Sequence, residues 1–96
     1  MEKQHLERHI EDLYDIFLKL KTKQECKAFL EDLCTYKEVE QMALRAYAAK
    51  LFLTGKTYAE IIEETEVSSA TLSRVSRAIT HGSGGYRAIL DEDGHE

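Results

Sequence analysis

Residues 57–79 read TYAEIIEETEVSSATLSRVSRAI and contain the pattern that decides the fold. The first half begins at Thr57, whose hydroxyl can cap a helix, and Glu60 stands three residues later at the capping-box position. The second half begins at Ser68, another residue typical of helix N-caps. Apolar side chains recur at helical spacing in both halves, which predicts one buried face on each helix. Two short helices joined by a tight turn make a helix-turn-helix.

The turn between these helices contains Glu66 and Val67. Val67 can fill the angle between the two helices. Glu66 stands where such turns usually carry glycine, because the backbone there often takes a positive φ. The sequence therefore leaves the local geometry at Glu66 open. The side chains expected to face inward are Ile61, Ile62, Val67, Leu72, Val75 and Ile79.

The outward side of the second helix begins with short side chains and continues with arginines. Short side chains leave room for a helix to approach base edges in the major groove, and arginines donate to phosphate and guanine. The alternative is a structural hairpin with a polar exterior, since such hairpins are common in proteins that bind no nucleic acid. The residues of this side are Ser69, Ala70, Thr71, Ser73, Arg74 and Arg77.

The composition predicts one all-helical domain. The chain has 96 residues, no proline, no tryptophan and about a third charged residues. No apolar run approaches the length that crosses a membrane, and the first residues are polar and of mixed charge. We therefore expect no signal peptide, no membrane anchor and a cytoplasmic location.

The formal net charge is −5, but the charges are unevenly distributed. Residues 1–44 carry ten acidic and seven basic side chains, and residues 88–96 carry four acidic side chains and no basic one. Residues 45–87 carry six basic and four acidic side chains, a net charge of +2. The basic balance thus coincides with the helix-turn-helix and the helix before it. This predicts weak non-specific DNA affinity and a reliance on base contacts and dimer geometry.

A first helix is expected over residues 3–20, with an apolar seam at alternating steps of four and three residues. Such a seam suits a partner subunit as well as the chain's own core. His5 and His9 are four residues apart and could share a metal, but no carboxylate or thiol stands at ligand spacing, so exposed helix surface is the better interpretation. The seam consists of Leu6, Ile10, Leu13, Phe17 and Leu20.

Two further capping boxes predict the next helix starts, at Thr22 with Glu25 and at Thr35 with Glu38. The inner face expected for the second helix is Cys26, Phe29, Leu30, Leu33 and Cys34, with the cysteines as apolar filler. The third helix is expected to run to about Leu53 and to end at Gly55. Its expected buried side chains are Val39, Met42, Ala46, Ala49 and Leu53.

Residues 81–87, HGSGGYR, predict a turn after the second helix of the helix-turn-helix. Gly82 suits the position just past a helix end. A phosphate-binding loop is less favoured, because no Lys-Ser/Thr pair follows the glycines. Residues 91–96 are acidic and expected to be disordered. No serine stands near a His–acid pair and the carboxylates are scattered, so we expect no enzyme.

From Thr35 onward, about two-thirds of the chain, the sequence resembles the Trp-repressor superfamily and within it the YerC/YecD-like branch. The resemblance implies an all-helical, intertwined homodimer in which the N-terminal helices of each chain wrap the other. The matching residues are Thr35-Tyr36-Lys37-Glu38, Arg45, Gly55-Lys56-Thr57-Tyr58, Glu60-Ile61, Ser68-Ser69-Ala70-Thr71-Leu72-Ser73-Arg74 and Gly84-Gly85-Tyr86-Arg87.

The resemblance also implies site residues. The DNA-reading positions of the family fall on Ser69, Ala70 and Thr71. Its amino-acid corepressor contacts fall on Thr35, Arg45 and Arg74. Where Trp repressor has glycine after the second arginine, to make room for the indole, this chain has Val75. We therefore predict that tryptophan is not a ligand, and that Arg45 and Arg74 contact phosphate or pair with a glutamate. An unknown small-molecule effector stays open.

The fold class predicted is all-α, a helical bundle with a helix-turn-helix, as an intertwined homodimer of Trp-repressor type. Residues 1–90 form one domain, with dimerisation helices over 1–54, the helix-turn-helix over 57–79 and a glycine-rich turn and short last helix over 80–90. The function predicted is a sequence-specific transcriptional regulator, a repressor, that binds double-stranded DNA. The alternative is a dimeric protein-interaction module. The DNA-binding residues predicted are Lys56, Thr57, Ser68, Ser69, Ala70, Thr71, Ser73, Arg74 and Arg77.

Overall fold

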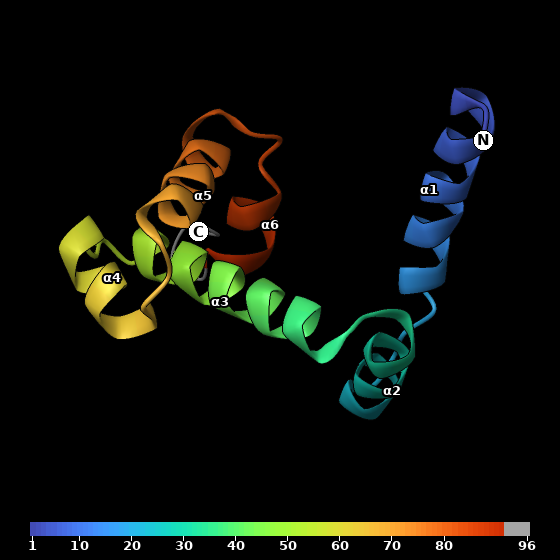
Figure 1. Ribbon diagram of the computed structural model, residues 1–96, viewed down its shortest axis with the longest axis horizontal. Coiled ribbons are helices and arrows are strands. Elements are labelled where there is room, and N and C mark those ends of the chain that lie inside the picture. The colour runs from blue at the N-terminus through green and yellow to red at the C-terminus, as the bar shows by residue number, and fades with distance from the viewer. Residues whose placement is uncertain (92–96) are drawn as a thin grey trace. The chain divides into compact units, whose positions relative to one another are not determined.

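The computed structural model describes residues 1–91, which form six α-helices and no strand (Figure 1). The prediction of an all-α chain is confirmed over this range, whereas residues 92–96 of the predicted disordered tail lie outside it. None of the helices in the described range is long and apolar enough to cross a membrane. The helices are α1 (Lys3–Phe17), α2 (Lys23–Leu33), α3 (Tyr36–Leu53), α4 (Tyr58–Thr65), α5 (Ser69–His81) and α6 (Gly85–Leu90).

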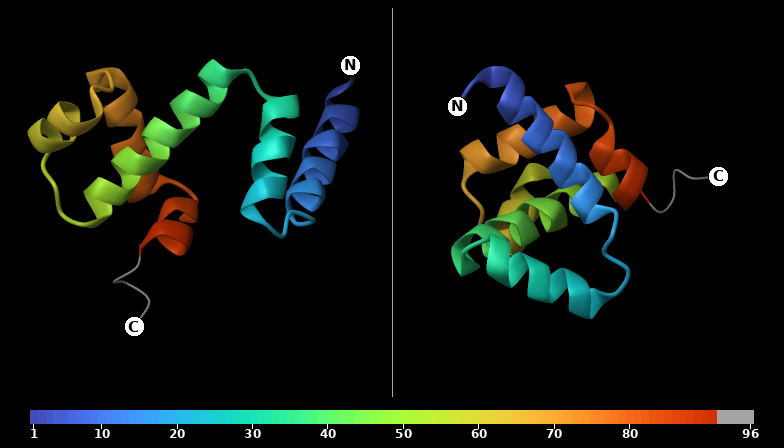
Figure 2. Two further views of the ribbon diagram at one scale, coloured as in Figure 1. Left: turned by 90° about the horizontal axis from the view of Figure 1, so that it is seen from below. Right: turned by 90° about the vertical axis from the view of Figure 1, so that its right-hand side faces the viewer.

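The chain divides into two compact units, Met1–Tyr36 and Lys37–Glu96. The first unit contains α1 and α2, and the second contains the helix-turn-helix, formed by α4 and α5. In the two views of Figure 2, α4, α5 and α6 gather around α3 in the second unit. That residues 1–90 join into one domain remains a prediction.

In the first unit, α1 is shorter than predicted. It ends at Phe17, and the N–H groups of Lys19 and Leu20 donate to the carbonyls three residues back, at 3.0 and 3.1 Å. These tight turns replace the last helical turn because the chain must reverse before α2 begins. Thr22 caps α2 as predicted, since its hydroxyl accepts from the N–H of Glu25 at 3.0 Å. In the predicted capping box, the Glu25 carboxylate would accept from the N–H of Thr22. It accepts instead from the N–H of the preceding residue, Lys21, at 2.8 Å.

The apolar faces of α1 and α2 are largely exposed in the single chain. Neither helix contains a buried residue. Leu6 and Leu33 are each 50% exposed, although Phe17 and Phe29 pack edge to face with ring centroids 5.7 Å apart. The seam predicted for the first helix is therefore present as an apolar surface, not as part of this chain's own core.

The core lies in the second unit, where α3 meets the helix-turn-helix. Its buried side chains are Ala48, Leu51, Ile61, Val67 and Leu72, with Leu44 and Phe52 packed against them. Ile61 and Leu72 are fully buried, and burial of a side chain of this size contributes about 1.5–3 kcal/mol. Val67 and Val75 are also buried, which confirms their predicted inward positions.

Two predictions about the core are wrong. Ile62 is 37% exposed, whereas its neighbour Ile61 is fully buried in the core with residues of α3 and α5. Of the five side chains expected to be buried on the third helix, only Ala49 is; Met42 is exposed, and Ala48 and Leu51 are buried instead. Apolar residues occur on several sides of α3, so their spacing does not select the side against which the helix-turn-helix packs.

The end of α3 is closed by two hydrogen bonds. The N–H of Gly55 donates to the carbonyl of Phe52 at 3.0 Å, and the N–H of Lys56 donates to that of Leu51 at 3.1 Å. Gly55 has a φ of +94°, which glycine adopts without strain. This pattern is a Schellman motif and confirms Gly55 as the residue that ends the helix.

The turn of the helix-turn-helix resolves the geometry left open at Glu66. Glu66 has a φ of 58° and a ψ of 20°, the left-handed conformation, and its N–H donates to the Ile62 carbonyl at 2.8 Å. The buried Thr65 hydroxyl donates to the Ile61 carbonyl at 2.7 Å and accepts from the N–H of Val67 at 3.3 Å. The N–H groups of Glu66 and Val67 are therefore both hydrogen-bonded, although a residue with a side chain occupies a glycine-type position.

The start of α4 is the predicted capping box. The Thr57 hydroxyl accepts from the N–H of Glu60 at 3.2 Å, and the Glu60 carboxylate accepts from the N–H of Thr57 at 2.9 Å. The Thr57 hydroxyl also donates a hydrogen bond to the Glu60 carboxylate at 3.1 Å. The hydrogen bonds from the Thr57 N–H and hydroxyl lower the pKa of Glu60; burial raises this pKa by a smaller amount, and the charge of Lys56 lowers it least.

We expect Glu66→Gly to raise the free energy of unfolding by up to about 1 kcal/mol, because glycine removes the left-handed strain at the cost of some chain entropy. Glu64→Gly, two residues earlier inside α4, is the matched control and should lower it by about 1 kcal/mol. Urea denaturation of both variants measures the difference. An equal decrease in the free energy of unfolding in the two variants would contradict backbone strain at Glu66.

We expect the capping box to lose its contribution to stability in acid. Since the pKa of Glu60 is lower in the folded chain, its contribution is complete above the pKa of an unfolded glutamate, about 4.3, and disappears as pH falls through the folded value. Urea denaturation of the native chain and of Glu60→Gln should differ at neutral pH and converge below that range. A difference that persists unchanged in acid would count against the carboxylate's role.

Candidate nucleic-acid interface

The first turn of α5 presents short side chains to solvent. Ser68 caps the helix as predicted, with its hydroxyl accepting from the N–H of Thr71 at 3.1 Å. The same hydroxyl donates to the Thr71 hydroxyl at 3.0 Å, so the two side chains hold each other in place. Ser69 and Ala70 are exposed and Thr71 is half-buried. A surface this shallow lets the helix tip approach a flat or grooved partner closely.

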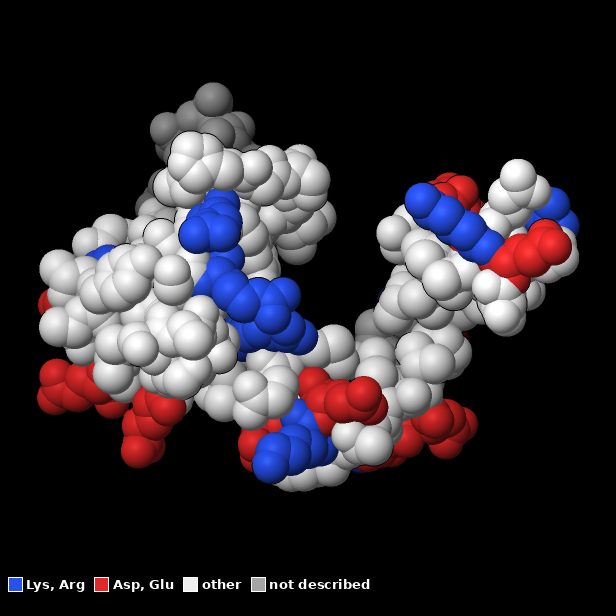
Figure 3. Space-filling view, turned by 45° about the horizontal axis from the view of Figure 1, so that its top comes forward, with Lys and Arg blue, Asp and Glu red and all other residues white. Residues whose placement is uncertain are grey.

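The arginines follow on the same helix. Arg74 and Arg77 are exposed and line a shallow hollow of about 370 Å³ together with Ala78, His81 and Gly82. Neither arginine forms an ion pair within the described residues. Figure 3 shows Lys and Arg side chains in a continuous run over one face of the second unit, with Asp and Glu side chains set apart at its edge. Both guanidinium groups are therefore available to an anionic partner.

Lys56 and Thr57 have different surroundings. Lys56 lines a hollow of about 350 Å³ with Glu60, Glu63 and Glu64, and the Thr57 hydroxyl is occupied in the capping box. The structure thus brings the predicted residues of α5 together but places Lys56 among carboxylates, which weaken its attraction for an anion.

The predicted effector residues fall in different units. Thr35 belongs to the first unit, where it precedes α3 and has a bonding partner, whereas Arg45 and Arg74 belong to the second. Arg45 is half-buried, and neither arginine pairs with a glutamate within residues 1–91, so of the two predicted alternatives phosphate contact stays the prediction. Val75 is 2% exposed and belongs to the interior of the second unit.

No metal or thiol site competes with this interpretation in the described part of the chain. Residues 1–91 contain no group of three His, Cys, Asp or Glu side chains that could hold a metal ion. Cys26 and Cys34 are free and half-buried on and after α2. His81, which lines the hollow with Arg74 and Arg77, is not among the residues predicted from the sequence. Its spacing of four residues from Arg77 and seven from Arg74 could have indicated it.

Known proteins resemble this chain in sequence and in fold. The chain is 38% identical over 84 residues to the uncharacterized protein YerC of Bacillus subtilis (strain 168), covering 88% of this chain and 81% of that protein. A crystal structure of a candidate Trp repressor from Staphylococcus aureus is 38% identical with a TM-score of 0.85, covering 95% of this chain and 92% of the other.

A crystal structure of a TrpR-like protein from Eubacterium eligens ATCC 27750 is 36% identical with a TM-score of 0.83, covering 88% of this chain and 87% of the other. The model of the Trp repressor protein family matches residues 8–93. This match begins well before Thr35, where the motifs of the resemblance start. The chain belongs to the Trp repressor family.

Proposed function

We propose that this chain is a sequence-specific DNA-binding transcriptional regulator that acts as a homodimeric repressor. The observation that carries the proposal is the exposed face of α5, which runs from short side chains at the helix tip to unpaired arginines in a helix-turn-helix of the Trp repressor family. A repressor of this kind acts by occupying a promoter, so the function needs no catalytic group.

In the proposed complex, α5 enters the major groove with its first turn against the bases. Ser69, Ala70 and Thr71 read base edges, with the methyl groups of Ala70 and Thr71 against thymine methyls. Ser73 lies beside this surface. Arg74 and Arg77 donate to phosphates, which sets the position of the helix without reading sequence.

Contacts from outside α5 complete the proposed interface. The free N–H groups of the first turn of α5, beside Ser68, can receive another phosphate. Lys56 and Thr57 contribute from the start of α4, more weakly than the arginines because of the neighbouring glutamates.

The proposed dimer accounts for the exposed apolar side chains of α1 and α2. A surface that includes Leu6, Ile10 and Leu33 costs free energy in water unless a partner covers it. A second copy of the chain is the partner that the family suggests. Two recognition helices related by a two-fold axis would then enter successive major grooves about 34 Å apart.

An effector is a separate part of the proposal. The proposal is that tryptophan is not bound, because Val75 stands where the resemblance to Trp repressor implies a glycine that makes room for the indole, and Val75 is buried. The main role of Arg45 and Arg74 in this proposal is then contact with phosphate rather than with an effector. A different small molecule that tunes DNA binding is compatible with this arrangement.

We expect selection from a random duplex pool to enrich a palindrome with half-sites about one helical turn apart. The Arg74→Ala/Arg77→Ala double variant should enrich nothing, because it keeps the short helix tip but loses the phosphate donors. Sequencing of the bound pool after several rounds measures both.

The same selection discriminates the rival function. A dimeric protein-interaction module would enrich no sequence even at low salt, and its interface would more often present aromatic anchors than the serines, threonines and arginines of α5. Enrichment by the double variant equal to that of the native chain would also contradict the proposal.

We expect Arg77→Ala to weaken binding to all sequences alike, and Thr71→Ala to relax discrimination at one base position by about 1–3 kcal/mol. Arg8→Ala in α1 is the matched control for Arg77→Ala, since it removes an exposed arginine outside the proposed interface. Fluorescence anisotropy on the selected duplex and on single-base variants measures the effects. Identical profiles for Arg77→Ala and Thr71→Ala would contradict the division of roles.

A further inference from the structure

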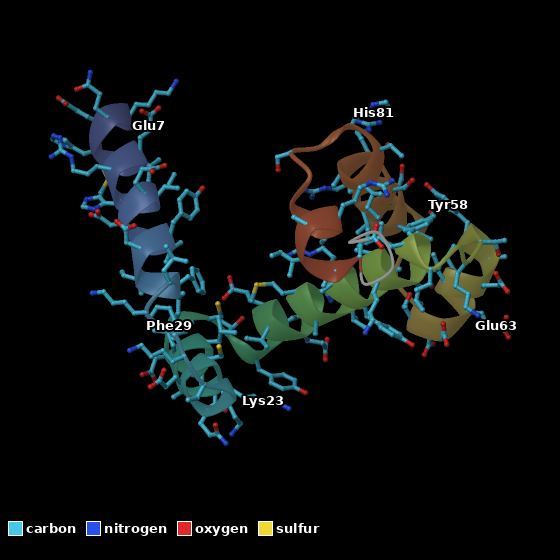
Figure 4. The ribbon with its side chains drawn as sticks, turned by 180° about the vertical axis from the view of Figure 1, so that it is seen from behind. Glu7, Lys23, Phe29, Tyr58, Glu63 and His81 are labelled. Atoms are coloured by element: carbon cyan, nitrogen blue, oxygen red, sulfur yellow. The ribbon has the colours of Figure 1, made fainter. Side chains whose placement is uncertain are left out.

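His81 is exposed in the last turn of α5 and has no role in the function proposed so far. It lines the same hollow as Arg74 and Arg77. Figure 4 shows its side chain at the outer end of α5, projecting away from the helices of its unit. The three nitrogen-bearing side chains therefore share one open surface of the helix.

The spacing of these side chains suits a row of phosphates. Arg74, Arg77 and His81 stand at positions i, i+3 and i+7 and thus on one side of the helix. At 1.5 Å per residue, Arg77 lies about 4.5 Å and His81 about 10 Å along the axis from Arg74. The three donors are therefore spread over about 10 Å of the helix surface, so they can contact different phosphates.

The floor of the hollow allows a close approach. It consists of Ala78, whose side chain is one methyl group, and Gly82, which has no side chain. The N–H of Gly82 donates to the Ala78 carbonyl at 2.9 Å, and a Cβ at Gly82 would overlap that oxygen. The tight helix end that glycine permits thus keeps the space beside His81 open to a phosphate oxygen.

The charges around the hollow favour an anion. Its ionisable lining groups are Arg74, Arg77 and His81. The helix α6, which contacts α5, carries Tyr86 and Arg87. The helix α4, which also contacts α5, has its glutamates in the hollow around Lys56, and Figure 4 shows Glu63 and His81 on different sides of the unit.

We propose that His81 is a third phosphate-contact residue, whose imidazole N–H donates to a phosphodiester oxygen of DNA at the edge of the half-site. This inference rests on the proposed DNA-binding function. The recognition helix of a helix-turn-helix reads bases with its N-terminal residues. Its last turn therefore lies toward the sugar–phosphate backbone, where a donor contributes affinity but no sequence discrimination.

The test compares binding of an unrelated duplex at low salt and of the selected operator. His81→Glu places a negative charge against the backbone and should weaken binding to both by about tenfold. His81→Arg keeps a donor and should bind at least as tightly as the native chain. His5→Glu, the same change at an exposed histidine of α1, is the matched control and should bind as the native chain does. Circular dichroism verifies that the variants are folded.

A direct contact is separated from a general charge effect by neutral methylphosphonate linkages placed one at a time at the edge of the half-site. The linkage opposite His81 should weaken the native chain several-fold and should weaken His81→Ala no further, because the two changes remove the same contact. Additive losses at every linkage would overturn the contact.

The outcomes distinguish the two proposals. Binding of the native chain with no loss in His81→Glu overturns the role of His81 and leaves the DNA-binding function standing. Absence of binding to any duplex at low salt overturns both.

Discussion

The packing of the helix-turn-helix on α3 is the contact on which the second unit depends. Ala48 and Ala49 have no exposed surface, so the backbone of α3 can lie close to its neighbours. Ile61 from α4 and Leu72 from α5 fill the space against it. Helices of 8 and 13 residues are marginal alone, and their stability comes from burial of one face. The direction in which α5 presents its outer face therefore follows from this core.

The turn at Glu66 shows how the core and the backbone support each other. A left-handed conformation costs about 1–2 kcal/mol for a residue with a side chain. Val67, the next residue, is buried in the core, and the Thr65 hydroxyl bonds on both sides of the turn. These contacts hold the strained geometry, which in turn sets the angle between α4 and α5.

The two units present surfaces of opposite character. The first has exposed apolar faces and no buried residue on either helix. The second has a closed core, a basic face on α5 and an acidic one on α4. A chain with a net charge of −5 can still attract DNA when its positive groups gather on one face, because screening in salt limits repulsion from distant charges. The separation of charge also favours one orientation of α5 toward an anion.

The sequence by itself determined the local features. Helix starts at Thr22, Thr57 and Ser68 were predictable, because a capping hydrogen bond joins residues only three positions apart. The end of α3 at Gly55 was predictable for the same reason. The α5 residues of the candidate interface were also visible as a pattern, since the outward side of a short amphipathic helix follows from its inward one.

The tertiary structure decided what depends on neighbours distant in the chain. Which side of α3 is buried depends on where α4 and α5 pack, so Ala48 and Leu51 rather than Met42 entered the core. The surroundings of Lys56 and the hollow that joins His81 to the arginines are likewise set by packing and by where each helix ends. Local hydrogen bonds are encoded within a few residues, whereas burial and electrostatic surroundings are properties of the packed chain.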